Sequence, residues 1–246
     1  MNRMLVVAGI LSAVIAGAWV GAHSARVSAA SQPAPLEAPV GAALLPGLGN
    51  YDFKITTRNP EVQRWFNQGL MLTFGFNHDA AERSFLKAAQ LDPDCAMCWW
   101  GAALVLGPHV NAQMDPADNP KAWQSLQRAV ALAPKVTERE RAFIHALESR
   151  YAENPPEDRR LLDEAYAKAT GALVAQRPDD LDARVFHAEA LMDLQPWDYY
   201  DEKLAPKGNT AAVVSLLESV MKENPNHAGA LHLYVHAVEA SADPQR

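Results

Sequence analysis

Three ionisable side chains near the end of the chain have a spacing that could bind a metal ion. His232 and His236 are four residues apart, and Glu239 follows three residues later. On an α-helix these positions share one face, so both imidazoles could reach one ion and the carboxylate could add an oxygen. His227, just before this stretch, could approach the same site. Imidazole and carboxylate ligands suit copper(II) or zinc.

The same spacing also has a plainer interpretation. A helical H-x-x-x-H pair without the glutamate of an H-E-x-x-H motif is more often a solvated or peptide-binding face. Metal binding and a simple polar surface therefore both stay open. The sequence contains no legible Ser-His-Asp arrangement, phosphate-binding glycine loop or paired carboxylates, so it favours a non-enzymatic role without deciding the matter.

The two cysteines of the chain, Cys95 and Cys98, form one C-x-x-C motif. Asp94 could cap a helix that begins here, and the dipole of that helix would favour a thiolate in its first turn. However, a thioredoxin-like site follows a β-strand, and no strand pattern precedes this motif. Haem attachment requires C-x-x-C-H, and here Trp99 stands in place of the histidine. A local disulfide, metal ligation and redox chemistry remain as alternatives.

Two more histidines, His78 and His109, lie in segments that we expect to be turns. Both turns would lie at the same edge of the molecule and could bring additional ligands to the metal site. The alternative is that they are ordinary turn residues.

These candidates must be positioned by helices, because the chain carries a helical-hairpin repeat. Trp65, Gly69, Ala81, Phe85, Ala88 and Pro93 fall at positions 4, 8, 20, 24, 27 and 32 of a 34-residue unit, and Trp99 follows Trp65 by 34 residues. This spacing is a tetratricopeptide-repeat (TPR) signature. It predicts an all-α TPR-type solenoid, because a single hairpin cannot bury its apolar face alone.

Prolines and apolar spacing divide the rest of the chain. We expect helices at 95–107, 137–151, 159–176, 181–195, 210–222 and 228–241, and the second helix of the second hairpin should end before Pro134. We expect inserts near 107–120 and 195–209. The solenoid would then cover 59–246, with about four repeats and one unpaired helix. The apolar Leu231, Tyr234, Val235 and Val238 of that last helix would lack a cover, so a dimer contact or further downstream helices is expected.

In TPR arrays the first helix of each hairpin lines a concave groove. This register places Phe66 and Trp100 in an apolar half of the groove. It places four ionisable residues in a polar half: Arg141, His145, Glu148 and Glu189. A peptide or protein partner is the expected occupant.

The first thirty residues have the pattern of a secretory signal peptide: Arg3, an apolar run from Leu5 to Val20, and small residues at the end. An uncleaved membrane anchor is the alternative. A Pro/Ala/Gly-rich linker at 31–58 follows. Without residues 1–30 the chain has 20 basic and 29 acidic residues, a net charge of −9 that disfavours nucleic acid as a partner.

From Asn59 onward the chain resembles a group of exported bacterial TPR proteins. The shared motifs are F-x-F-N-H-D-A-A at 74–81, D-P-D-C-A-M-C-W-W-G at 92–101 and N-P-N-H-A-G-A-L-H-L-Y-V-H-A-V-E at 224–239. The resemblance implies a helical-repeat fold, and it implies longer relatives, of which this chain would be a fragment.

Two functions follow as hypotheses. The first is an exported scaffold, periplasmic or in the cell envelope, whose groove binds a peptide or protein. The second is a copper- or zinc-binding protein for storage, delivery or catalysis.

Overall fold

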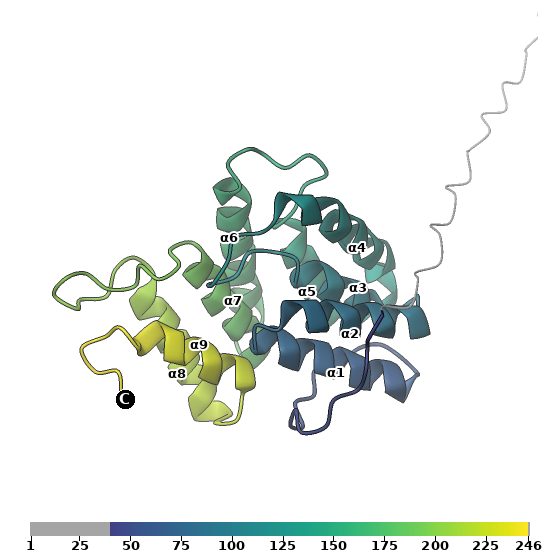
Figure 1. The fold of residues 1–246 in the computed structure, drawn as a ribbon, viewed down its shortest axis with the longest axis horizontal. Coiled ribbons are helices and arrows are strands. Elements are labelled where there is room, and N and C mark those ends of the chain that lie inside the picture. The colour runs from purple at the N-terminus through teal and green to yellow at the C-terminus, as the bar shows by residue number, and fades with distance from the viewer. Residues whose placement is uncertain (1–39, 246) are drawn as a thin grey trace, which may run out of the picture. The chain divides into compact units, whose positions relative to one another are not determined.

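The computed structural model describes residues 40–245, a range that folds into nine α-helices and two 3₁₀ helices without a β-strand. The α-helices are α1 (Pro60–Phe74), α2 (His78–Leu91), α3 (Ala96–Leu104), α4 (Asn119–Leu132), α5 (Glu138–Glu148), α6 (Arg160–Gln176), α7 (Leu181–Asp193), α8 (Thr210–Glu223) and α9 (Ala228–Val238) (Figure 1). The 3₁₀ helices are Pro116–Asp118 and Ala133–Lys135. The all-α prediction is confirmed. The signal peptide or anchor expected at 1–30 lies outside the described residues.

Side chains at the helix starts explain where several helices begin. Asn59 accepts a hydrogen bond from the Glu61 amide at the start of α1. At the start of α5, Thr137 and Glu140 form a reciprocal capping box. Each such bond satisfies a backbone N–H that has no partner inside the helix. No helix of the described residues is long and apolar enough to cross a membrane.

Consecutive helices pack against each other along the whole described chain, and odd-numbered helices also meet one another. Contacts join α1 to α3, α3 to α5 and α7 to α9, and α9 returns to contact α1. The inner faces of the odd-numbered helices therefore surround a common interior. This interior positions the candidate sites below.

Two glycines permit the close approach of α1 and α3 to α2. A Cβ atom on Gly69 would lie 2.6 Å from the Phe85 ring, and one on Gly101 would lie 2.4 Å from the same ring. Phe85 is fully buried between them. Only glycine leaves room for an aromatic ring at both positions, because real non-bonded carbon contacts lie near 3.5–4.0 Å.

Helix α9 is better covered than its sequence suggested. Val238 is buried and Tyr234 is partly buried, because α9 packs on α8, α7 and α1. The expectation that these two residues lack a cover is therefore wrong. Leu231 and Val235 are 43% and 55% exposed, so an apolar strip of two residues does remain on the outer face of this helix.

Candidate functional site

Residues 50–57 run through the interior between the odd-numbered helices, and we call them the inner segment. Tyr51, Phe53, Ile55 and Thr57 are buried or half-buried, whereas Asp52, Lys54 and Thr56 are exposed. This alternation has the period of extended backbone. The linker expected at 31–58 is thus wrong for this part, which packs into the fold.

Phe53 anchors the inner segment in an aromatic pocket. Its ring centroid lies 5.6 Å from that of Phe66 on α1, 6.4 Å from Trp100 on α3 and 5.4 Å from Phe143 on α5. The guanidinium of Arg139 lies 3.9 Å from the centroid of the same ring, in a cation–π arrangement. With 1% exposure, Phe53 is among the largest fully buried side chains.

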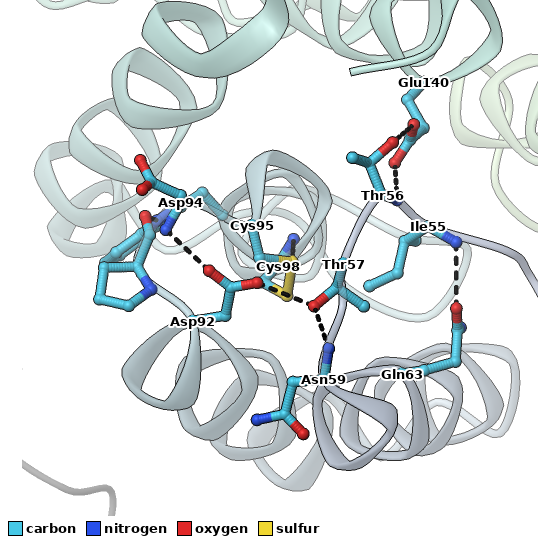
Figure 2. Close-up of a disulfide and its surroundings, with 12 residues drawn as sticks. Ile55, Thr56, Thr57, Asn59, Gln63, Asp92, Asp94, Cys95, Cys98 and Glu140 are labelled. Carbon is cyan, nitrogen blue, oxygen red and sulfur yellow. Dashed lines mark hydrogen bonds between the residues drawn. A yellow bond between two sulfur atoms is a disulfide. The ribbon is translucent and has the colours of Figure 1, made fainter. Parts of the chain in front are cut away.

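Two helix side chains bind the backbone of the inner segment directly (Figure 2). Gln63 of α1 accepts from the Ile55 amide at 3.1 Å and donates to the Phe53 carbonyl at 2.8 Å. Glu140 of α5 accepts from both the amide and the hydroxyl of Thr56, each at 2.5 Å. The bonds to the Phe53, Ile55 and Thr56 peptide groups do not depend on which side chains the segment carries, whereas the bond to the Thr56 hydroxyl does.

Tyr51 connects the inner segment to the last two odd-numbered helices. Its hydroxyl donates to Asp182 of α7, and its ring lies 5.5 Å from that of His227 at the start of α9. The Asp182 carboxylate also forms hydrogen bonds with His227 Nε2, at 3.1 Å, and with the Arg139 guanidinium, at 2.7 Å. Burial opposes ionisation of Asp182, but these donors outweigh it and hold its pKa below the usual value.

His227 is therefore a structural residue and not the metal ligand we expected. Its Nε2 contacts Asp182, and its Nδ1 accepts from the Ala230 amide at 3.4 Å, which caps α9. With both ring nitrogens engaged and 2% exposure, it offers no free lone pair. Cys95 has the matching role at α3, where its sulfur accepts from the Cys98 amide at 3.1 Å.

The predicted groove anchors Phe66 and Trp100 are fully buried. In this structure Phe53 of the inner segment packs against both rings. Trp100 also packs edge-on against Phe186 of α7, at 5.5 Å between centroids. Aromatic residues on the inner faces fill the space that a polar groove would leave open.

Three of the predicted polar groove residues lie elsewhere. Arg141 and His145 line a surface depression of about 400 Å³ between α5 and α6, and Glu148 bonds to His145 on the exposed face. Their placement in the interior is wrong, because Phe143 occupies the inner face of α5. Glu189 of α7 is half-buried and lies near the buried Arg150; burial raises its pKa although Arg150 opposes this.

The cysteines form a disulfide at the start of α3, with Cα atoms 5.4 Å apart. Both residues are fully buried, close to the inner segment at Thr57 (Figure 2). Thiol–disulfide exchange requires access to a sulfur atom. The arrangement therefore suits a structural bridge, and the disulfide excludes both sulfurs as thiolate ligands while it is intact.

Four histidines surround Phe76 at one end of α1, and we call His78, His109, His232 and His236 the histidine cluster. The Phe76 ring centroid lies between 4.4 and 6.0 Å from each of the four imidazoles. His78 and His109 thus share contact with this ring with the two α9 histidines. Among residues 40–245, however, no three His, Cys, Asp or Glu side chains are grouped to hold a metal ion.

Within the cluster, His78 and His109 form one pair and His232 and His236 another. The rings of the first pair have centroids 4.0 Å apart. Burial lowers the pKa of His78, and burial together with the nearby His78 and Arg150 lowers the pKa of His109 to about 4. In the second pair the two Nε2 atoms lie 3.1 Å apart. Glu239 bonds to Nδ1 of His236 at 2.9 Å, so it orients that ring.

An open cleft of about 1100 Å³ adjoins the inner segment where α7 and α9 begin. Its lining is mostly polar: Asn50, Asp52, Arg139, Arg177, Asp180 and Asn226 are among its residues. Arg139 and Asp180 form a salt bridge at 2.6 Å, so these two opposite charges in the cleft are paired with each other.

Sequence reasoning missed the inner segment. The signal was present in Tyr51-Asp52-Phe53-Lys54-Ile55, where apolar and charged residues alternate as in a half-buried extended chain.

Comparison of the chain with protein-family models, with curated proteins and with solved structures finds no match.

Proposed function

We propose that this chain is a TPR-type solenoid whose inner face recognises an extended polypeptide segment. The observation that supports this is the inner segment, a piece of the same chain that reaches α7 and the start of α9 through Tyr51, and α1, α3 and α5 through Phe53. Its alternate side chains enter the interior, and helix side chains bind its backbone. An extended peptide that inserts alternate residues into pockets is recognised in the same physical way.

The proposed specificity follows from the two aromatic positions. The pocket of Phe66, Trp100 and Phe143 accepts a large planar side chain, and Asp182 accepts a hydroxyl two residues earlier. The expected ligand motif is therefore Tyr-x-Phe in an extended chain. Aromatic anchors in buried pockets commonly dominate binding energy.

The site of action that we propose is the periplasm or cell envelope. The sequence pattern of residues 1–30 favours export, and the Cys95–Cys98 disulfide is of a kind that persists in oxidising compartments. A mature protein purified from an envelope fraction should therefore begin near residue 31, which intact-mass measurement would reveal.

A cleavable version of the full chain tests the recognition proposal. A protease site is inserted at Arg58, which is exposed and lies between the inner segment and the Asn59 cap. After cleavage, a fluorescent peptide of residues 43–57 should exchange with the native segment at one site. The uncleaved protein should not bind the peptide, because its site is filled.

A peptide with Phe53→Ala is the matched control and should bind roughly 100-fold more weakly, as expected for loss of a central aromatic anchor. Equal binding of this peptide would contradict the proposed pocket. If cleaved and uncleaved proteins bind the peptide equally, or if neither binds it, the inner face does not function as a recognition site.

A further inference from the structure

We propose that His232 and His236 form a two-nitrogen chelate for a divalent transition metal, with copper(II) the preferred ion. The two residues lie one turn apart on α9, and their Nε2 atoms are separated by 3.1 Å. Two ligands about 2.0–2.1 Å from a common ion are separated by roughly 3 Å. This site is independent of the inner face and of any peptide bound there.

The hydrogen bonds of the other two ring nitrogens assign the tautomers. Nδ1 of His232 contacts the backbone carbonyl of Phe74, and Nδ1 of His236 contacts the carboxylate of Glu239 at 2.9 Å. Both partners can only accept, so each neutral ring carries its proton on Nδ1. Both Nε2 atoms then present lone pairs to each other, an arrangement that a cation between them would stabilise.

These outer contacts are the ones that metal-binding histidines ordinarily have. A ligand histidine usually donates its second N–H to a backbone carbonyl or a carboxylate, which fixes the ring and raises its basicity. Here one ring has the carbonyl and the other has the carboxylate. Glu239, which we first considered a ligand, instead orients the ring of His236.

The surroundings hold both rings while leaving a path for an ion. Phe76 lies 4.4 Å from the His232 ring and stacks on His236 at 5.6 Å. Trp197 also contacts the His236 ring, edge-on at 5.2 Å. The His236 side chain nevertheless keeps 17% exposure. Restricted rings lose little freedom when they bind, which favours chelation.

The choice of copper(II) follows from ligand type and number. Imidazole nitrogen binds copper(II) more strongly than zinc or nickel in the usual order of divalent ions. Two protein nitrogens leave the remaining positions to water or anions, and a tetragonal copper(II) ion accepts such mixed ligation. Zinc sites commonly use three or four protein ligands, and the described residues do not group that many here.

The test is a titration of the full-length, tag-free, metal-stripped protein with copper(II), followed by electron paramagnetic resonance and tryptophan fluorescence. We expect one saturable site with a spectrum of two nitrogen ligands. Fluorescence of Trp197 should be quenched, and Trp197→Phe should remove that quenching while the resonance signal persists.

His232→Ala combined with His236→Ala should abolish this site. If the double variant unfolds, His236→Gln alone is tested in its place, because His236 is partly exposed. This single variant should also remove the two-nitrogen signal. His145→Ala is the matched control, because His145 has the same glutamate partner three residues later but Arg141 in place of a second histidine. No saturable binding, or a two-nitrogen signal unchanged by His236→Gln, would overturn the proposal.

Discussion

Glu140 accepts both hydrogen bonds that Thr56 can donate, one from the amide and one from the side-chain hydroxyl. The same carboxylate also accepts from the amide and hydroxyl of Thr137, which caps α5. One buried side chain therefore joins the start of a helix to the inner segment.

Replacing Glu140 with alanine should lower the free energy of unfolding by about 3 kcal/mol, because the amides and hydroxyls of Thr56 and Thr137 lose a charged acceptor that is itself buried. Chemical denaturation measures the loss, and limited trypsin digestion at Lys54 and Arg58 should accelerate. Glu138→Ala, in the same helix turn but exposed, should change neither value appreciably. A loss of stability with an unchanged digestion rate would contradict the link to the inner segment.

Phe53→Ala should lower the free energy of unfolding by about 3–5 kcal/mol, the usual cost of truncating a buried aromatic ring. The neighbouring Lys54→Ala removes an exposed side chain and should cost less than about 0.5 kcal/mol. Urea denaturation of the two variants makes the comparison. Similar stability of both would mean that the aromatic pocket is not filled by the inner segment.

The Cys95–Cys98 disulfide should resist reduction in the native protein, because both sulfurs are buried. Dithiothreitol followed by alkylation and intact-mass measurement should detect modification in urea and not in buffer. Replacing both cysteines with alanine should cost about 2 kcal/mol from the closed-loop entropy of so short a bridge. Rapid reduction of the folded protein would instead indicate a redox-active motif.

Stability should fall as the pH drops from about 6.5 toward 4, partly because of His109. The folded protein holds the pKa of His109 at about 4, whereas an unfolded histidine titrates near 6.5. Between these values the unfolded state binds more protons, so the free energy of unfolding rises with pH. This side chain is partly exposed, so the effect will be smaller than the full shift implies.

The variant His109→Asn checks this assignment. In the native protein His109 Nδ1 accepts a hydrogen bond from the Asn111 amide, and the side-chain oxygen of the new asparagine can still accept it. Denaturation midpoints at pH 4.5, 5.5 and 7 should vary less with pH in this variant. An identical pH dependence in both proteins would assign the effect to other groups.

Helix ends were predictable from local chemistry. The threonine that caps α5 and the aspartate that caps α7 stand directly before apolar periodic stretches, and prolines close several helices. These signals act over four or five residues, so one sequence contains them completely. The helices expected at 159–176, 181–195 and 210–222 agree closely with α6, α7 and α8.

The face that each helix presents was harder to predict. In the first two predicted repeats the Trp and Gly positions set the expected register, but the third predicted repeat lacks them and follows an insert. The expected register places Arg141 on the groove face of its helix, whereas Phe143 occupies the inner face of α5. Two residues on a helix correspond to a rotation of roughly 200°, so a small counting error exchanges the inner and outer faces.

The histidine cluster was anticipated in part, whereas the inner segment was missed. His232 and His236 share a helix face by spacing alone, but their meeting with Phe76 requires α9 to return to α1, which local patterns do not encode. The inner segment lies in a stretch whose Pro, Ala and Gly content suggested a linker. Its short alternating core was outweighed by that composition.

The return of the chain upon itself has a consequence for how the molecule folds and unfolds. In an open repeat array each unit contacts only its neighbours, so end units can melt while the rest stays folded. Here a hydrogen bond joins Tyr51 to Asp182 across 131 residues of sequence, and another joins His232 to Phe74 across 158. Such distant pairings slow folding, since long loops must close first. They also couple α1 to α9, so that the described helices should melt as one cooperative unit.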